Sequence, residues 1–320
     1  MFTASDAKQL KECLPALDFQ AEVENSPLLL RYLNHYGLSV AALSDEKTHG
    51  THHAMGFFSS AGFRIAGHYY RPTKPAGTVF IVHGYYDHVG LFSHIISYCL
   101  ARKFAVVAFD LPGHGLSSGA PASIDSFAQY TQVLKDCIDM AQVAGVPAPY
   151  HVLAQSTGGS IVMDYVLSRC GQSQRQFKHI VLLAPLVRPH AWARGSMLHA
   201  VAKLFVKSIG RSYVPNSHDV EFLRFLREGD PLQSDRLVSA WVGALKQWLK
   251  VFEQYDCCDA GVTIVQGGED TTVDWRYNLN KIETKFPNAR VYMLPEARHH
   301  LVNESIEIRA QLLSILDSTL

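Results

Sequence analysis

A serine at the junction of a strand and a helix constrains this 320-residue chain more than any other feature. The apolar run of residues 149–154 predicts a buried strand, and residues 161–169 have the pattern of a helix. Between them, Ser156 stands in the sequence Gln-Ser-Thr-Gly-Gly (residues 155–159). A sharp turn at such a point lifts the hydroxyl above the sheet edge, beside free N–H groups at the helix N-terminus. The segment therefore predicts an α/β fold with a nucleophilic serine; the alternative is a serine that only caps the helix.

The serine turn departs at one position from G-x-S-x-G, the usual pattern around such a nucleophile. Ala154 stands in place of the first glycine. Alanine adds only a methyl group at this crowded point, so we expect the turn to accommodate it. A pentapeptide alone does not identify a catalytic site, and the interpretation depends on the partners that the rest of the chain supplies.

A second apolar run, residues 78–82, ends at a His-Gly turn and is followed by Tyr85. The pattern predicts a strand and then a tight turn. The backbone N–H of Tyr85 would point at the same substrate oxygen as the N–H of Thr157. Together these donors would form an oxyanion hole, in which removing one donor typically costs about 3 kcal/mol of barrier.

A third apolar run, residues 104–109, ends in a glycine-rich turn that permits tight backbone geometry near the site. Asp110 and His114 in this turn have the chemistry of an acid and a base, but they precede the serine, where orienting loop backbone is the commoner role. We interpret both as scaffold. His83 and His88 are likewise interpreted as structural hydrogen-bond partners.

An acid and a base follow the serine in the order that this architecture uses. The run 262–266 ends in two glycines and is followed by Asp270; after the next run, 289–294, comes His299. A serine hydroxyl is too weakly acidic to attack an ester unaided. His299 would accept its proton and return it to the leaving group, while Asp270 fixes the imidazole tautomer. The sequence thus predicts Ser156, Asp270 and His299 as catalytic residues.

These residues together resemble the α/β-hydrolase superfamily, over about residues 50–320, and within it the serine-hydrolase branch that includes monoacylglycerol lipases and bacterial lysophospholipases. The motifs that carry the resemblance are His83-Gly84 with Asp87-His88, Phe109-Asp110 with Gly113-His114-Gly115, Ser156 with Gly158-Gly159, Asp230-Pro231-Leu232, Gln266-Gly267 with Asp270, and His299-x-Leu301-x-Asn303-Glu304. The last motif selects His299 over His300, because the family's histidine stands five residues before the glutamate. Ala154 and Gln155, where histidine is frequent, depart from the family pattern.

Strand and helix patterns alternate along most of the chain, which predicts a mostly parallel eight-stranded sheet flanked by helices. Residues 51–58 and 63–70 have the pattern of an initial antiparallel pair. The six further strands are expected near residues 78, 104, 149, 179, 262 and 289.

An insertion interrupts this alternation after the strand near residue 179. Helical patterns replace the alternation there, one of them from Met197 to Ile209 and ended by Gly210. Such an insertion would lie over the serine as a cap. We expect an N-terminal helical extension at residues 1–45 and a hydrolase core in two parts, residues 46–185 and 257–320. The helical cap between the two parts of the core is expected at residues 186–256.

The cap is where substrate choice is expected to reside. Its apolar residues are candidates to line an acyl-chain tunnel: Trp192, Met197, Leu198 and Phe205. The alternative is that this apolar stripe only packs on the domain beneath. Transient contact of the cap with a membrane surface is a further hypothesis, with basic residues flanking an apolar face: Lys203, Lys207 and Arg211.

Composition fits a soluble enzyme: 48% of residues are hydrophobic, 18% are charged, and the formal net charge is zero. No basic block indicates a nucleic-acid partner. No apolar stretch approaches the roughly 20 residues that span a bilayer, and the N-terminus lacks the pattern of a signal peptide. We expect a cytoplasmic protein and leave its oligomeric state open.

The six cysteines form no C-x-x-C pair, and we expect most of them to be small buried hydrophobes; the alternative is a redox-active pair at Cys257 and Cys258. His49, His52 and His53 cluster before a strand but lack a partner set at ligand spacing. No metal site and no cofactor are predicted.

The residues favour a serine carboxylic-ester hydrolase that acts through an acyl-enzyme. The resemblance implies a small-molecule acyl ester such as a monoacylglycerol or a lysophospholipid. An acyltransferase or thioesterase using the same residues, and a non-catalytic ligand-binding relative of the fold, stay open. The serine nucleophile argues against the aspartate-dependent branches, and the His-Gly-Tyr-Tyr turn (residues 83–86) disfavours an aminopeptidase.

Overall fold

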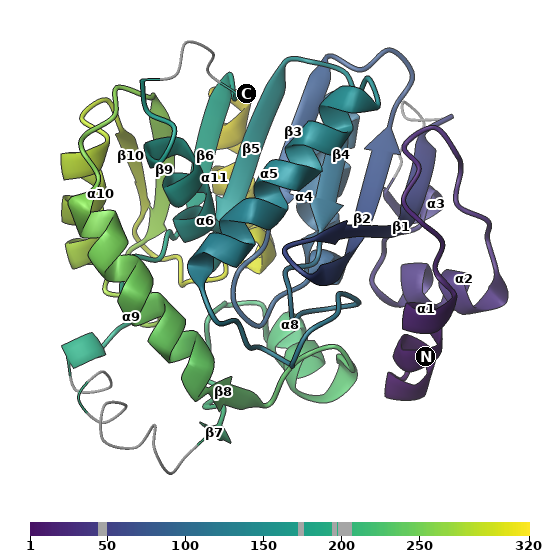
Figure 1. The fold of residues 1–320 in the computed structure, drawn as a ribbon, viewed down its shortest axis with the longest axis horizontal. Coiled ribbons are helices and arrows are strands. Elements are labelled where there is room, and N and C mark those ends of the chain that lie inside the picture. The colour runs from purple at the N-terminus through teal and green to yellow at the C-terminus, as the bar shows by residue number, and fades with distance from the viewer. Residues whose placement is uncertain (44–49, 172–175, 194–196, 198–206) are drawn as a thin grey trace.

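The computed structural model describes residues 1–43, 50–171, 176–193, 197 and 207–320. Its main element is an eight-stranded sheet of order β1-β2-β4-β3-β5-β6-β9-β10 (Figure 1). Its strands are β1 (His52–Ser60), β2 (Phe63–Arg71), β3 (Gly77–Val82), β4 (Phe104–Phe109), β5 (Tyr150–Gln155), β6 (His179–Leu183), β9 (Val262–Gly267) and β10 (Arg290–Leu294). β1 and β2 pair antiparallel, β2 runs antiparallel to β4, and the other pairs are parallel. The predicted α/β fold and its eight strands are confirmed.

Helices cover both faces of the sheet (Figure 1). Those described are α1 (Ala4–Cys13), α2 (Pro27–His35), α3 (Val40–Leu43), α4 (Ser93–Ala101), α5 (Phe127–Val143), α6 (Thr157–Leu167), α8 (Val220–Arg224), α9 (Ser239–Gln254), α10 (Trp275–Lys285) and α11 (Ile306–Asp317). Helical turns also form at η2 (Val89–Phe92), η3 (Phe225–Gly229, a π-helix) and η4 (Leu301–Asn303). Helices α5, α6, α9 and α10 share one core, while α1, α2, α4 and α11 share the other.

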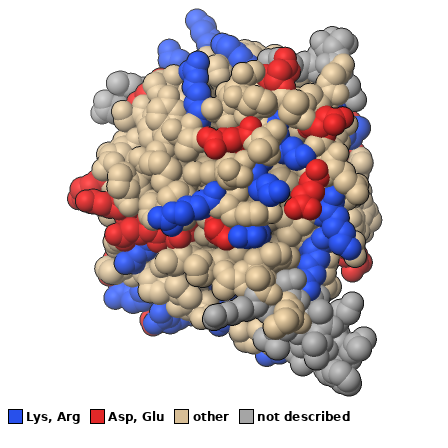
Figure 2. All heavy atoms as spheres, turned by 90° about the vertical axis from the view of Figure 1, so that its left-hand side faces the viewer, with Lys and Arg blue, Asp and Glu red and all other residues tan. Residues whose placement is uncertain are grey.

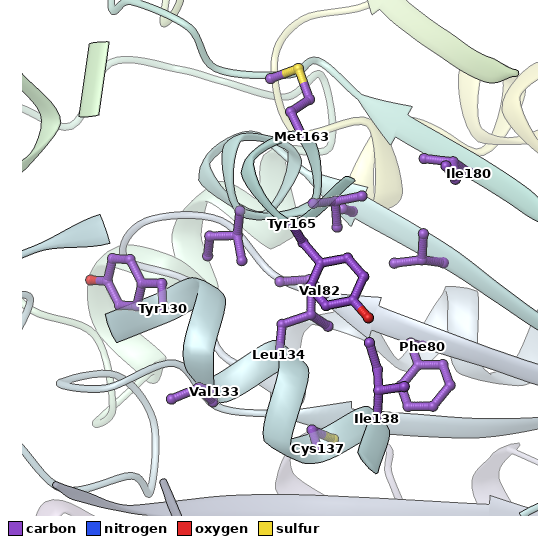
Figure 3. Close-up of a cluster of buried hydrophobic side chains, with 14 of the residues drawn as sticks. Phe80, Val82, Tyr130, Val133, Leu134, Cys137, Ile138, Met163, Tyr165 and Ile180 are labelled. Carbon is purple, nitrogen blue, oxygen red and sulfur yellow. The ribbon is translucent and has the colours of Figure 1, made fainter. Parts of the chain in front are cut away.

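The sheet strands read as continuous apolar runs because both of their faces are buried. In β3, Phe80 and Val82 belong to the core on one face, and the alternate residues Val79 and Ile81 belong to the core on the other. Figure 3 shows the first core, where side chains of α5 such as Leu134 pack against Phe80 and Val82. Two full cores fix the sheet, and the sheet fixes the loops at its carboxyl edge.

The N-terminal extension packs on the core and covers the edge of the sheet. Ser26 caps α2 and Pro27 lies in its first turn, where proline is favoured because its missing N–H would have no partner in the helix. Helix α1 was not predicted, although a reciprocal Thr3–Asp6 capping box begins it. Beyond α1 the chain pairs with β1, where the Leu17 N–H donates to the Phe57 carbonyl at 2.8 Å. The outer strand is therefore partly covered by the chain's own N-terminal segment.

The insertion after β6 is only partly helical in the residues described. The helix expected up to Ile209 is wrong at its end, because Ser208–Gly210 forms a short strand, β7, that pairs antiparallel with β8 (Arg236–Val238). At these residues the backbone pairs with β8 and does not continue the expected helix. Two further helical patterns of the insertion, around residues 220–227 and 237–255, correspond to α8 with η3 and to α9. The domain boundaries themselves stay a prediction.

Two of the six cysteines form a disulfide, so the expectation of free, buried thiols is wrong for Cys170 and Cys258. The bridge connects the chain just beyond α6 to the segment before β9, 88 residues away in sequence. Cys99 and Cys137 are buried as predicted, whereas two more are free and exposed: Cys13 and Cys257.

Two members of the predicted histidine cluster, His52 and His53, are the first residues of β1 and make hydrogen bonds within the protein. His52 contacts the Phe19 carbonyl at 3.1 Å, and His53 contacts His68 at 3.3 Å. His49 lies outside the described residues. These hydrogen bonds give the rings of His52 and His53 a structural role.

Basic and acidic side chains are interspersed on the face seen in Figure 2, which is the left-hand side of Figure 1. This mixture agrees with the formal net charge of zero. In the part of the chain that the structure describes, no helix is both long and apolar enough to cross a bilayer.

Candidate active site

The site lies at the carboxyl edge of the sheet, where the strand order reverses. The chain passes from β3 to β4 on one side and then returns to β5 on the other side of β3. Loops leaving neighbouring strands diverge at such a reversal and leave a crevice between them. Tyr85 follows β3 and Ser156 follows β5, so both of these candidate residues border this crevice.

Ser156 occupies a strained turn between β5 and α6. Its φ is +53° and its ψ is −116°, a region that residues with side chains rarely adopt. The turn is possible because Gly158 lies where a Cβ would be 2.2 Å from the Val82 carbonyl oxygen. Ala154 is fully buried within β5 and pairs with Val82, so the strand accommodates the extra methyl group. The Ser156 side chain makes no helix-capping hydrogen bond, which argues against a mere cap.

The three residues predicted as catalytic lie in one hydrogen-bonded chain. Ser156 Oγ is 2.9 Å from His299 Nε2, and His299 Nδ1 is 2.8 Å from Asp270 Oδ2. With Nδ1–H donating to the carboxylate, Nε2 is the unprotonated nitrogen that accepts from the serine hydroxyl. All three side chains are buried. The arrangement can move a proton from Ser156 to His299.

Asp270 is held in place by three donors besides the histidine. The N–H groups of Thr272 and Val273 donate to Oδ1 at 2.8 and 3.1 Å, and the Gln266 amide donates to Oδ2 at 3.0 Å. Burial alone would raise the pKa of Asp270, but the charge of His299 and these hydrogen bonds outweigh it and lower the pKa. The carboxylate therefore stays ionised. Gln266 was not singled out as a site residue, although it belongs to a quoted family motif.

The same charges act on the histidine in the opposite sense. Burial would lower the pKa of His299, but the Asp270 carboxylate, and more weakly Asp87, raise it above the ordinary 6.5. A raised pKa makes His299 a stronger proton acceptor, and the ring must be neutral to act as one.

Glu304 fixes the loop that carries His299. Its buried carboxylate accepts hydrogen bonds from the N–H of Arg298 at 2.6 Å and from the N–H of His218 at 2.8 Å. The neighbouring His300 makes no hydrogen bond to Ser156; its Nε2 lies 3.3 Å from Asp87 Oδ1. Sequence reasoning used Glu304 only to choose between the histidines, and it missed this positioning role.

Two backbone N–H groups at the border of the crevice have no partner in the described part of the chain. Neither the N–H of Tyr85 nor that of Thr157 hydrogen bonds to a described residue. The turn before Tyr85 packs on the serine, since a Cβ at Gly84 would lie 3.2 Å from Ser156 Cβ. The Tyr85 ring is held aside, with its hydroxyl donating to the Ala122 carbonyl at 2.7 Å. Both donors are therefore available near the serine.

Residues interpreted as scaffold make structural hydrogen bonds. The Leu111 N–H donates to His83 Nε2 at 2.9 Å, and Asp110 accepts from the N–H groups of Val89 and Leu116 at 2.8 and 2.7 Å. His114 Nδ1 contacts the Pro112 carbonyl at 2.9 Å. These contacts shape the loops around the site.

A buried junction joins the core, the cap and the N-terminal extension. His88 Nε2 lies 2.9 Å from Asp230 Oδ2, and neither side chain is exposed. The Tyr36 hydroxyl, just beyond α2, donates to Asp230 Oδ1 at 2.7 Å. His35 contacts the carbonyl of Gly229 at 3.0 Å. The sequence motifs that contain His88 and Asp230 do not indicate this contact, and no sequence pattern assigns a role to residues 1–45.

A cavity of about 620 Å³ opens on Ser156 and His299 beneath the insertion. Its apolar wall consists largely of Tyr85, Leu186, Trp192, Leu223, Leu226, Leu237, Trp241 and Val242. Trp192 lines it as predicted. Met197 does not line the cavity, since its side chain is 71% exposed. The prediction was wrong because helical spacing alone does not say which side of a segment faces the core. Leu198 and Phe205 lie outside the described residues.

The basic residues assigned to a membrane-facing surface separate in the structure. Arg211 lines the cavity and is half-buried, so its assignment to an outer surface is wrong. It directly follows β7, and its guanidinium lies over the Tyr86 ring. Lys207 is exposed, and Lys203 lies outside the described residues.

Comparison with known proteins shows one family match and several relatives. The family model described as "Serine aminopeptidase, S33" matches residues 73–306. A monoacylglycerol lipase of Mycolicibacterium smegmatis is 30% identical over 152 residues, which cover 47% of this chain and 52% of the relative. A monoglyceride lipase homolog of Monkeypox virus is 24% identical over 264 residues, 78% of this chain and 91% of the relative. The match thus spans about half the length of the mycobacterial relative.

Among solved structures, a soluble variant of monoglyceride lipase from Saccharomyces cerevisiae, in complex with a substrate analog, has a TM-score of 0.69. It is 15% identical, and the superposition covers 82% of this chain and 92% of the yeast chain. At this identity the likeness establishes the fold.

Proposed function

The chain belongs to the serine aminopeptidase S33 family of α/β-hydrolases, and from this premise we propose that it is a serine carboxylic-ester hydrolase. The observation that carries the proposal is the hydrogen-bonded chain from Ser156 through His299 to Asp270, beside two backbone N–H groups that have no partner among the described residues. Such an arrangement activates a serine and binds the oxyanion that forms when it attacks a carbonyl.

The proposed reaction proceeds through an acyl-enzyme. Ser156 Oγ bonds to the ester carbonyl carbon as its proton passes to His299 Nε2, and the carbonyl oxygen becomes an oxyanion held by the N–H groups of Tyr85 and Thr157. The tetrahedral species then breaks its bond to the alcohol oxygen, which takes the proton from His299. Water repeats the sequence on the acyl-enzyme, releases the carboxylic acid and restores Ser156. Asp270 stays ionised throughout and orients the imidazole.

The cavity supports a lipid-like acyl ester, a monoacylglycerol or a lysophospholipid, as the substrate class. Its wall is mostly apolar and aromatic, which suits an acyl chain. Two relatives have names that refer to monoacylglycerol or monoglyceride lipase activity. The peptidase named in the family description is disfavoured by the turn at residues 83–86, which lacks a Gly-Pro oxyanion sequence.

Ester hydrolysis by wild-type protein and by Ser156→Ala is the test of this proposal. Nitrophenyl esters from acetate to palmitate report the rate and the preferred chain length. We expect loss of turnover on the order of 10⁶-fold or to background in the variant. Ser168→Ala removes an exposed serine just beyond the same helix and serves as the matched control. Equal rates for wild type and Ser156→Ala would refute the nucleophile, and an inert but folded wild type would favour a binding protein.

Two alternatives share the same first half-reaction, and product analysis separates them. An acyltransferase would pass the acyl group to an added alcohol, and a thioesterase would prefer thioesters to oxygen esters of the same acyl chain. Accumulation of the free acid from oxygen esters in the presence of alcohols is the result expected of a hydrolase.

A further inference from the structure

Arg211 is a positioned cation in the wall of the cavity. It follows β7, and its backbone N–H donates to the Asp235 carbonyl at 2.8 Å. Its guanidinium stacks over the Tyr86 ring, 4.0 Å from the centroid, and lies 4.8 Å from that of Tyr213. Nη1 donates to the side-chain oxygen of Gln233 and, at 3.4 Å, to the Ser234 carbonyl. The side chain is thus held by two aromatic rings and two neutral acceptors.

One edge of this guanidinium has no partner in the part of the chain that the structure describes. Both of the acceptors are contacted by Nη1, and Nε and Nη2 make no hydrogen bond to any described residue. Within the described part of the chain, no carboxylate forms an ion pair with Arg211. The Nε and Nη2 donors lie in one plane and match two oxygens of a phosphate or carboxylate. A cation held by neutral groups in a partly enclosed wall presents this edge to a ligand.

The position of Arg211 relates it to the reacting centre. The residue beneath its guanidinium, Tyr86, directly follows the proposed oxyanion donor Tyr85. The charge of Arg211 also helps to lower the pKa of Asp87. The buried Asp87 carboxylate in turn contacts His300 and helps to raise the pKa of His299. Arg211 therefore lies on the side of the cavity that carries Tyr86 and Asp87, next to the proposed oxyanion donor.

The charges of the cavity wall favour an anion over a neutral head group. Among the described residues that line the cavity, the charged ones besides three histidines are Asp87, Arg211 and Arg227. Asp87 is engaged by His300. Arg227, which is exposed at the wall, adds a second positive charge. The remainder of the wall is mostly apolar and suits an acyl chain.

We propose that Arg211 selects acyl esters whose alcohol part carries a phosphate, which makes lysophospholipids the preferred substrates over neutral monoacylglycerols. The proposal rests on the ester-hydrolase function above. The Nε–Nη2 edge binds two phosphate oxygens while the acyl chain occupies the apolar wall. The ester carbonyl then lies at Ser156. Arg211 is a specificity residue in this scheme and takes no part in bond breaking.

The test compares three soluble substrates with one acyl chain: monodecanoylglycerol, its phosphate monoester and its phosphocholine diester. Each is assayed below its micelle-forming concentration with wild type, Arg211→Gln, Arg211→Lys and Lys250→Gln. The last variant removes one positive charge from the exposed surface of α9 and controls for net charge. The two phosphate substrates distinguish a terminal phosphate from a zwitterionic head group.

We expect wild type to have the higher kcat/KM on the phosphate-bearing esters. Arg211→Gln should lower that value about 10- to 100-fold, mainly through KM, because a charge-assisted bidentate contact is lost. The rate on the neutral ester should change little. Arg211→Lys should be intermediate, since it keeps the charge but not the planar edge, and Lys250→Gln should behave as wild type.

Equal or better hydrolysis of the neutral ester by wild type would overturn the selection by Arg211 and leave the hydrolase proposal intact. An equal loss on all three substrates in Arg211→Gln and Arg211→Lys would also overturn it, because it would indicate a structural role. A wild type that hydrolyses no ester at all would overturn both proposals together.

Discussion

Replacing Asp230 by alanine should destabilise the protein strongly, because this carboxylate is the centre of a buried junction. Its side chain and that of His88 are 0% exposed and lie 2.9 Å apart. The Tyr36 hydroxyl donates to the same carboxylate at 2.7 Å, and the Leu232 N–H donates at 3.0 Å. The substitution removes the acceptor of all three donors while leaving them buried.

The expected loss in the free energy of unfolding follows from the known cost of removing one partner of a buried charged pair. Breaking a buried charged pair typically costs about 3–5 kcal/mol, since the remaining polar groups cannot reach water. Tyr36→Phe removes one hydrogen bond to a charged group and should cost about 2 kcal/mol. Lys135→Met, which breaks an exposed pair with Asp139 on α5, should cost less than about 1 kcal/mol and is the control.

Urea denaturation at neutral pH measures these differences. Burial would raise the pKa of Asp230, but the His88 ring and the hydrogen bonds from Tyr36 and Leu232 outweigh it and lower the pKa. A lowered pKa means that the contribution of Asp230 is fully present above its ordinary value of 3.8 and is lost as the pH falls through the folded-state value. Neutral pH thus measures the whole effect. A loss in Asp230→Ala no larger than that in Lys135→Met would refute the reasoning.

Two further predictions concern the pH profile and the disulfide. Since Asp270 and Asp87 raise the pKa of His299, kcat/KM should fall as the pH drops through a midpoint above 6.5, and Asp87→Asn should move that midpoint down; a wild-type midpoint below 6.5 would contradict this. Cys170→Ser opens the bridge to Cys258, which closes a loop of 88 residues, and should lower the free energy of unfolding by about 2–4 kcal/mol in oxidising buffer. Dithiothreitol should do the same to wild type and nothing to the variant, and a wild type insensitive to reductant would argue against the bridge.

The sheet and the residues at its carboxyl edge could be predicted because their signals are local. The central strands are apolar runs, and Ser156, Asp270 and His299 each follow such a run. In a parallel sheet, carboxyl ends share one edge. Three short motifs far apart in sequence therefore predict one site, and the distances between these residues agree with that prediction.

The cavity wall could not be predicted in the same way, because it depends on how the insertion packs on the core. An apolar helical stripe gives a period and no direction, so Trp192 was placed correctly and Met197 was not. The sequence could not predict the position of Arg211, because this position depends on the pairing of β7 with β8. Each of these strands has only three residues, which is too short for a periodic pattern. The partner of Cys170 was hidden for a similar reason, because a bridge over 88 residues has no local pattern.

The N-terminal extension shows why a family match does not delimit the structure that supports a site. The match begins at residue 73, yet Tyr36 reaches the Asp230 carboxylate from outside it. Asp230 follows the π-helix η3, whose Leu226 and Arg227 line the cavity. The extension is thus connected to the η3 segment of the cavity wall by two hydrogen bonds, from Tyr36 to Asp230 and between His35 and the Gly229 carbonyl. Residues absent from the family pattern therefore help to position the residues that contact the substrate in the proposed reaction.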